Sequence, residues 1–393
     1  MVRCRVQLLG LALVVGSVFG PFDRLGVLRA QGPEAWQYAE SGGRFDSIPG
    51  RISDAEFWEL SERMSEPDGH FRSDNLLSNE LYYPEILDEL VTRVRSGGVY
   101  LGVGPEQNFN YIAAVRPRIA FITDVRRGNL QLHLLYKALF ELSADRAEFV
   151  SRLFTKPRPA GLGATSSATD IMTAYWVTDT SPREAFDANV RAVQKHLTST
   201  HSLPLSQPDL DAIADIYTEF YWHGPSITYS STSNTGFGRG GSMANYHQLM
   251  VATDAKGAVR SYLATEDAFA FVKHLESRNL VVPVVGDFGG PRALRAVGDF
   301  VRGKDATVSM FYLSNVEQYL RQAGTHPAFC ANVASMPLDP ASTYVRSQSG
   351  GGGFRNMLGA MTAETAACAV PGAAPIAAPI TPWRPGASAP GVR

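Results

Sequence analysis

The sequence predicts an α/β fold in which a sheet with a parallel core carries helices on both faces. Three observations lead to this prediction. Four short apolar runs have the composition of buried strands, amphipathic helical patterns alternate with them, and glycine, aspartate or serine stands where each run ends. Strands and helices that alternate at these lengths form parallel sheets with right-handed crossovers.

The first half of the core is predicted to begin with two helices. Ser53 and Glu56 have the spacing of a capping box and predict a helix start, and Pro84 suits the first turn of the next helix. Buried strands are then expected at 99–103 and 119–123, and a helix with an apolar face follows each of them. This half therefore contributes the first two core strands.

A large insertion is predicted between the second and third core strands, at about residues 145–260. It ends in a polar stretch rich in glycine and serine, 226–242. The alternation then resumes, with strands expected at 280–285 and 307–313. The helices expected in and after the insertion are 185–197, 209–221, 266–277 and 291–301.

The two ends of the chain are expected to lie outside this domain. Residues 1–30 resemble a signal peptide, because two arginines precede an apolar run that is too short to cross a bilayer comfortably. The folded domain is expected at 35–345, and a Gly-rich and then Ala/Pro-rich tail, 346–393, is expected to be disordered. These features predict an exported protein, periplasmic or secreted, with no stable membrane span after signal removal.

Two cysteines, Cys330 and Cys368, would remain after removal of the signal. An oxidising compartment permits them to pair and to tether the C-terminal segment. The alternative is one buried thiol and one thiol in the tail. The histidines are scattered and no Cys/His pattern has metal-ligand spacing, so no metal is expected.

The composition argues against a dedicated nucleic-acid binder. Lys and Arg number 36 and Asp and Glu 38, which gives a net charge of −2 and no basic surplus for a phosphate backbone. The 393 residues, 45% of them hydrophobic, describe a globular protein with a sizeable core. The sequence does not indicate an oligomeric state.

The strand ends carry the candidate site. Ligands of open α/β sheets bind beyond the carboxyl ends of the strands, and the first of these ends is a loop from Gly102 and Gly104 to Glu106, Gln107 and Asn108. A pair of glycines permits a tight turn and close approach of the backbone to a ligand. This loop is therefore the first part of an expected small-molecule site.

Acidic residues follow the next two strands. Asp124 stands twenty residues after Gly104, at a position suited to accept hydrogen bonds from the two hydroxyls of a ribose. Asp287 and Phe288 follow the third strand, where an acid suits an exocyclic amine and a ring suits an adenine. Together the three strand ends suit one adenosine.

In these residues the sequence resembles the class I S-adenosylmethionine-dependent methyltransferase superfamily. It looks still closer to a little-characterised bacterial family with a methyltransferase-like fold, in the segments SDNLLSNE and YLGVGPEQNFNYIAAVRPRIAFITDVRRGNLQLHLLYKALFE. The resemblance spans 50–145 and 265–325 and implies a Rossmann-like, methyltransferase-type core. It also implies cofactor-binding roles for the glycine loop, Asp124, Asp287 and Phe288, with S-adenosylmethionine as the cofactor.

Two positions depart from the superfamily pattern. Tyr100 occupies the place of its usual acidic residue, and Glu106 the place of its usual third glycine. An anionic side chain at 106 would either engage the amino group of a methionine moiety or exclude the cofactor. Purely structural roles also stay open. Gly102 and Gly104 would let a helix pack on the strand, and Asp124 would pair with neighbouring arginines at the surface.

Further polar residues have two interpretations. Asp287 would alternatively cap the next helix. Asn75, Asn79 and Glu80 precede the helix before the first strand, where the superfamily often closes its pocket, or serve as turn and cap residues. His223 and His247 flank the polar stretch of the insertion. Each is either a general base or an ordinary histidine.

Two functions remain open at this point. One is an exported methyltransferase-like protein that binds S-adenosylmethionine and transfers a methyl group to an acceptor that the sequence does not identify. No catalytic residue is indicated for it. The other is a non-enzymatic binding or envelope protein that retains the fold without the cofactor.

Overall fold

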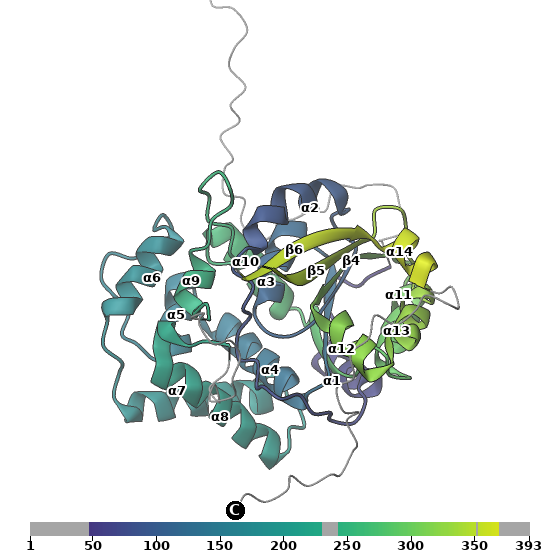
Figure 1. The fold of residues 1–393 in the computed structure, drawn as a ribbon. Helices are drawn as coiled ribbons and strands as arrows, with labels where there is room; N and C mark the ends of the chain where they lie inside the picture. Colours follow the sequence, from purple (N-terminus) through teal and green to yellow (C-terminus); the bar gives the residue numbers. More distant parts are fainter. Residues whose placement is uncertain (1–46, 230–242, 351–352, 369–393) are drawn as a thin grey trace, which may run out of the picture.

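A six-stranded mixed sheet forms the centre of the molecule in the computed structural model (Figure 1). The structure describes residues 47–229, 243–350 and 353–368. The strands lie in the order β3-β2-β1-β4-β5-β6, the first five are parallel, and β6 runs antiparallel to β5. They are β1 (Val99–Gly102), β2 (Ile119–Asp124), β3 (Val281–Val285), β4 (Val308–Ser314), β5 (Thr343–Gly350) and β6 (Gly353–Ala360).

The predicted α/β class is confirmed. The four expected strands are β1 to β4, and the order of the five parallel strands is that of a doubly wound sheet. The chain reverses direction across the sheet between β3 and β4, so the switch point lies between β1 and β4. In such sheets this is where ligands bind.

The apolar strands are buried along their whole length, as expected for a sheet covered on both faces. Pro283 lies within β3, where it cannot donate a ladder hydrogen bond. Because β3 is an edge strand, the missing donor leaves no partner strand unpaired. The position of this proline therefore agrees with the strand order.

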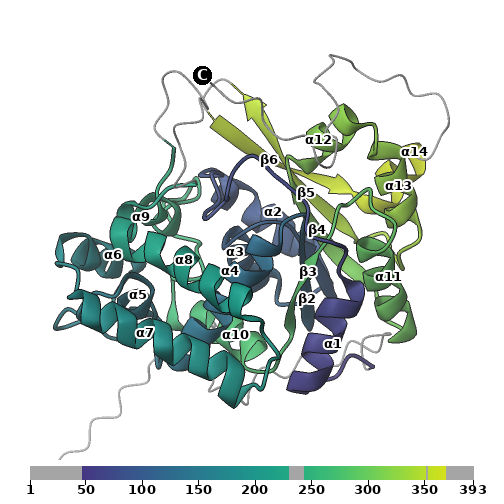
Figure 2. The same cartoon turned by 90° about the horizontal axis from the view of Figure 1, so that it is seen from below.

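Helices cover both faces of the sheet (Figure 2). On one face α2, α3, α4 and α10 contact one another, and on the other α1, α11, α12 and α13 do so. Their bounds are α1 (Asp54–Met64), α2 (Leu87–Arg93), α3 (Gln107–Val115), α4 (Arg127–Leu142), α10 (Glu266–Glu276), α11 (Ala293–Gly303), α12 (Val316–Ala323) and α13 (His326–Ala334). A short 3₁₀ turn, η1 (Tyr83–Ile86), precedes α2.

The insertion between β2 and β3 is helical and packs around α4 at one side of the sheet (Figures 1 and 2). Two of its helices, α7 and α8, correspond to the helices expected at 185–197 and 209–221. The helices of the insertion are α5 (Arg146–Phe154), α6 (Ala168–Val177), α7 (Arg183–Lys195), α8 (Gln207–His223) and α9 (Tyr246–Met250), with a π-helical turn η2 (His196–Thr200) and a 3₁₀ turn η3 (Gly224–Ser226).

The expected C-terminal boundary needs a correction. The structured chain extends past 345, because β5, β6 and a final helix, α14 (Met361–Cys368), follow β4. The two strands of this hairpin pair as far as Gly350 and Gly353, within the segment that was expected to be a flexible tail. The polar character of the hairpin strands concealed them, because buried positions such as Ser347 and Asn356 are polar.

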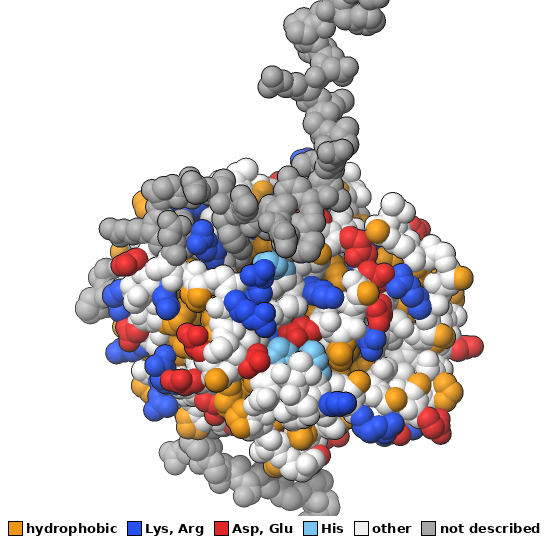
Figure 3. Space-filling view, turned by 180° about the vertical axis from the view of Figure 1, so that it is seen from behind, with side chains coloured by type: hydrophobic (Ala, Val, Ile, Leu, Met, Phe, Trp, Pro, Cys, Tyr) orange, Lys and Arg blue, Asp and Glu red, His pale blue; other side chains and the backbone are white. Residues whose placement is uncertain are grey.

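The expected signal peptide, 1–30, and the Ala/Pro-rich end of the tail, 369–393, lie outside the described residues. Among the described helices none has the length and apolarity needed to cross a membrane. Basic and acidic side chains are interspersed on the face shown in Figure 3, in keeping with a net charge of −2.

Candidate functional site

An irregular segment, Glu66 to Glu80, runs along the carboxyl edge of the sheet; we call it the strap. Along the strap, successive hydrogen bonds reach the ends of β3, β2, β1 and β4, which is the order of these strands in the sheet. Glu66 accepts from the backbone N–H of Asp287 after β3 at 3.2 Å, and Gly69 donates to the carbonyl of Val125 after β2 at 2.8 Å. Ser78 then donates to Glu106 after β1. Glu80 reaches Ser314 at the end of β4. The strap therefore covers the edge where a ligand was expected.

The loop after β1 is tightly packed around Asn108. Its side-chain amide donates to the carbonyls of Val103, Gly104 and Pro105 at 3.0, 3.0 and 2.6 Å, and its Oδ1 accepts from the hydroxyl of Tyr100 at 2.9 Å. A Cβ at Gly102 would lie 1.9 Å from that Oδ1. Gly102 is therefore required for packing against Asn108, the structural role that had been left open for it.

Gly104 has the backbone conformation that favours glycine, with φ +73°, and no atom of a described residue lies within 4 Å of a Cβ built there. Its carbonyl oxygen lies 2.9 Å from Nε2 of His133 on α4, which is buried. Burial lowers the pKa of this imidazole to about 4, so the ring is neutral at physiological pH. His133 was not among the residues predicted from the sequence, because it lies in a helix otherwise defined by leucines.

Glu106 is fully buried, and both of its carboxylate oxygens accept from the backbone N–H of Ser78, at 3.2 and 3.1 Å. Burial raises the pKa of this carboxyl to about 8, and the nearby carboxylate of Glu80 adds to the effect. Its neighbour Gln107 is also buried, and its Oε1 accepts from Asn110 at 3.5 Å. Glu106 thus joins the strap to the loop after β1.

Asp124 ends β2 and is buried, with 5% of its surface exposed. Its Oδ1 accepts from the backbone N–H of Arg126 at 2.9 Å and lies 3.4 Å from Nε of the same arginine. Asp124 therefore pairs with a neighbouring arginine, as one alternative expected, although the carboxylate is buried and Arg126 is only partly exposed. Three buried polar atoms at or just after the end of β2 make no hydrogen bond to any described residue: Thr123 Oγ1, Arg126 Nη2 and Asn129 Oδ1.

Asp287 and Phe288 lie on the same edge, and the backbone N–H of Gly286 donates to the carbonyl of Asp124 at 2.8 Å. Asp287 accepts from Gly289 N–H at 2.8 Å and does not cap α11. Glu66 of the strap takes that role, since its Oε1 accepts from the first backbone N–H groups of the helix at 2.7 and 3.0 Å.

The ring of Phe288 is packed inside the molecule. It is 3% exposed, stacks on Phe329 of α13 with centroids 6.0 Å apart, and lies 5.0 Å from the ring of Phe311 in β4. The structure brings Asp124 and Asp287 together at the edge, while the aromatic ring expected to contact adenine turns into the core.

Glu80 lies at the end of the strap and is 1% exposed. Ser314 of β4 and Asn356 of β6 both donate to its carboxylate. Burial raises the pKa of Glu80, and burial, with the carboxylate of Glu80 adding to the effect, raises the pKa of Tyr111. The hairpin of β5 and β6 was not predicted from the sequence, but its Asn356 completes the polar surroundings of Glu80, which was a candidate residue.

The remaining candidates lie around this edge or in the insertion. Asn75 has a left-handed backbone, φ 47°, and Asn79 is half-buried, both within the strap. His223 ends α8 and lies 3.3 Å from Glu219, and His247 of α9 packs its ring edge against Trp176. Burial lowers the pKa of His247. Both histidines belong to helices of the insertion.

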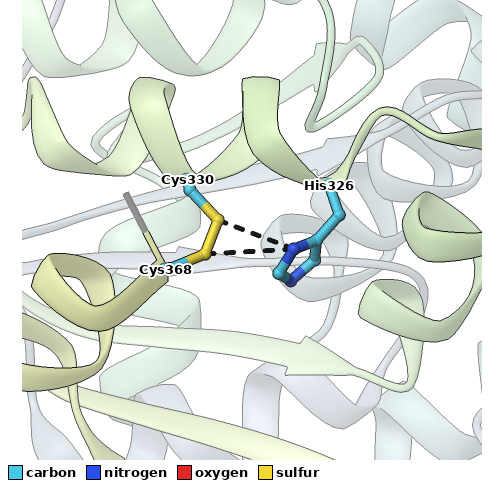
Figure 4. Close-up of side chains that lie close together, drawn as sticks. All are labelled: His326, Cys330 and Cys368. Atoms are coloured by element: carbon cyan, nitrogen blue, oxygen red, sulfur yellow. Dashed lines mark hydrogen bonds between the residues drawn. A yellow bond between two sulfur atoms is a disulfide. The ribbon is translucent and has the colours of Figure 1, made fainter. Parts of the chain in front are cut away.

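Cys330 and Cys368 form a disulfide between α13 and α14, which settles the pairing that the sequence left open (Figure 4). The imidazole of His326 lies beside it, with Nδ1 3.6 Å from one sulfur and 3.9 Å from the other. A second cluster of groups that bind metals elsewhere in nature joins Glu141, His196 and His201. No metal-ligand spacing in the sequence had indicated either group.

Fold and site together define an α/β protein with a strap across the carboxyl edge of a mixed sheet. The family model described as a domain of unknown function (DUF7790) matches residues 75–208 and 219–364, and the chain belongs to this family. No curated protein matches the sequence.

Proposed function

We propose that the protein binds a small adenosyl ligand at the carboxyl ends of β1, β2 and β3, on a sheet of methyltransferase type. The observation that carries the proposal is Asp124. This buried carboxylate ends the strand next to β1, and buried polar atoms of Thr123, Arg126 and Asn129, at and just after this strand end, make no hydrogen bond within the described part of the chain. Such atoms favour a hydrogen-bonding ligand, because a buried polar group without a partner costs stability.

The fit differs between the parts of the ligand. A ribose suits Asp124, whose carboxylate accepts from hydroxyl groups. The adenine contact expected from Phe288 is not offered, because its ring packs on Phe329. Glu106 is bonded to Ser78 of the strap, so a methionine group would require the strap to move.

With S-adenosylmethionine bound, the cofactor would supply an activated methyl group, and the protein would mainly align it with an acceptor. Asp124 would hold the ribose, and the loop from Gly104 to Asn108 would hold the adjoining end of the ligand. The strap would exclude water from the edge. No base is assigned for this transfer.

A second function is a binding or envelope protein without the cofactor. It is favoured by Asn108, whose amide already bonds to three carbonyls of the loop, and by Glu66, which bonds the strap to the start of α11. Export, which the sequence predicts, supports this function too, because cells do not normally supply S-adenosylmethionine outside the cytoplasm.

Calorimetry on the full chain separates the two functions. We expect heat of binding with S-adenosylmethionine or its demethylated product, and we expect Asp124→Ala to abolish it because the ribose acceptor is lost. Asp299→Ala, at an exposed position on α11, is the matched control and should bind like the wild type. Absence of binding heat at millimolar ligand would exclude the adenosyl function and leave the binding-protein function.

A further inference from the structure

Two histidines and a glutamate meet at the junction of the insertion and the sheet domain. His196 and His201 belong to the π-helical turn η2 and the residue after it, and Glu141 lies near the end of α4. The N–H of His201 donates to the carbonyl of His196, five residues earlier, at 3.1 Å. This π-type bond brings two side chains five positions apart to one face, and π-helical turns are frequent at functional sites.

Both imidazoles converge on one oxygen of the glutamate. Nε2 of His196 lies 2.8 Å, and Nε2 of His201 2.6 Å, from Oε2 of Glu141. The two imidazole planes are nearly perpendicular to each other, at 85°. Ligand atoms of a tetrahedral zinc site lie about 3.3 Å apart, given metal–ligand bonds of about 2.0–2.2 Å. Side-chain shifts of about half an ångström would therefore open this cluster for an ion.

The second nitrogen of His201 has the partner that metal-binding histidines usually have. Its Nδ1 lies 2.7 Å from Oδ1 of Asp54, and that oxygen also accepts from Asn279 at 2.8 Å. A carboxylate behind a metal-binding imidazole orients the ring and leaves the opposite nitrogen to face the ion. Asp54 comes from α1, so the contact is independent of the turn that carries the histidines.

The two carboxylate oxygens of Glu141 have different neighbours, and only Oε2 faces the imidazoles. Lys137 bonds to the other oxygen, Oε1 of Glu141, at 2.7 Å, and also to the carbonyl of Glu276. The ammonium of Lys137 would weaken cation binding without occupying Oε2.

The side chains are shielded but not sealed: the exposed fractions are 14% for His196, 6% for His201 and 10% for Glu141. The group at His326 is less suited to an ion, because its two sulfurs are bonded to each other and offer no thiolate. Two imidazoles and one carboxylate are the protein ligands of several catalytic zinc sites, where a fourth position stays open.

We propose that Glu141, His196 and His201 form a binding site for a divalent transition-metal ion, with Zn²⁺ as the ion that this ligand set suits. Asp54 orients His201 and is not itself a ligand. The ion joins α4 of the sheet domain to the turn η2 of the insertion. On binding, the protons that the imidazoles share with Glu141 are released to solvent.

Zinc titration of the full chain tests the site. The protein is stripped with a chelator, dialysed and titrated with Zn²⁺ by calorimetry at neutral pH, and bound metal is measured after gel filtration. We expect one zinc ion per chain and release of protons, seen as a dependence of the measured heat on the buffer. The affinity should fall as the pH is lowered, because the ligands must lose their protons.

Variants separate this site from other zinc-binding groups. His196→Gln should lower the affinity roughly tenfold or more, and Asp54→Asn should lower it by about 10–100-fold while leaving all three ligands in place. His326→Gln, beside the disulfide, is the matched control and should bind like the wild type. Co²⁺ in place of zinc should give visible absorption bands that His196→Gln removes.

Three results would overturn the site. The first is that the stripped wild type, after titration with Zn²⁺ and gel filtration, holds no zinc. The second is that His196→Gln binds zinc as tightly as the wild type, and the third is that His326→Gln no longer binds zinc. Circular dichroism of each variant shows whether it is folded. His196→Gln is preferred over a change at His201, because His201 also bridges two carboxylates in the fold.

Discussion

Glu106 is the residue at which burial and charge conflict most clearly. It is fully buried at the start of α3, and burial raises its pKa from 4.5 to about 8. The folded state therefore holds the proton of Glu106 more tightly than the unfolded chain does. Protonation stabilises the fold, and this stabilisation is lost as the pH rises through the interval between the two values.

We predict that Glu106→Gln removes this pH dependence. Between about pH 5.5 and 7.5 the free energy of unfolding of the wild type should fall relative to the variant by ~1.4 kcal/mol per pH unit. Urea unfolding followed by tryptophan fluorescence at several pH values measures the difference. Glu59→Gln, on the exposed side of α1, should run parallel to the wild type. Parallel profiles for the wild type and Glu106→Gln would show that Glu106 is ionised in the fold.

At the scale of elements, the C-terminal hairpin and helix depend on a covalent tie. The disulfide joins Cys330 of α13 to Cys368 of α14, 38 residues apart in sequence, and β5 and β6 lie between them. Within this loop Asn356 donates to Glu80 of the strap. The tie therefore holds in place one side of the polar network around Glu80.

We predict that Cys330→Ser combined with Cys368→Ser lowers the free energy of unfolding by about 3–4 kcal/mol, because the closed loop no longer restricts the unfolded chain. Denaturant unfolding in oxidising buffer measures the loss. In reducing buffer, wild type and variant should unfold alike, and the mass of the wild type should rise by about two daltons on reduction. Equal stability in both buffers would contradict a stabilising disulfide.

At the scale of the whole molecule, Arg146 ties the insertion to the sheet domain. Its guanidinium side chain is 2% exposed. It donates to Glu266 at 2.8 Å, to the carbonyls of Leu263 and Ala264 at 2.8 and 2.9 Å, and to Ala164 at 3.1 Å. Because the planar fork of an arginine serves several acceptors at once, one side chain joins three separate segments.

We predict that Arg146→Lys lowers the free energy of unfolding by about 3 kcal/mol, because one ammonium cannot reach the acceptors of the guanidinium and leaves buried carbonyls unpaired. Urea unfolding provides the measurement. Arg183→Lys, an exposed arginine paired with Asp187 on α7, should leave the midpoint unchanged. An unchanged midpoint for Arg146→Lys would show that other contacts hold the insertion.

Much of the core was predictable because its signals are local. The strands β1 to β4 are short apolar runs, and helices such as α4 and α8 repeat apolar residues every three or four positions. The hairpin was missed because several of its buried side chains, Ser347 and Asn356 among them, are polar, and Asn356 is bonded there to Glu80 of the strap. In the same way, Phe288 directly follows a core strand, a position from which a side chain at the ligand-binding edge was expected. Its ring instead packs against Phe311 and Phe329 in the core.

The sequence by itself determined the α/β class, the parallel core with its insertion, and the set of polar residues at the strand ends, because each depends on residues close together in the chain. The tertiary structure decided which of them share an environment. Asn356 reaches Glu80 from 276 positions away, and the strap bonds to four strand ends in turn. Such contacts depend on the path of the chain in space, and no local pattern of side chains encodes that path.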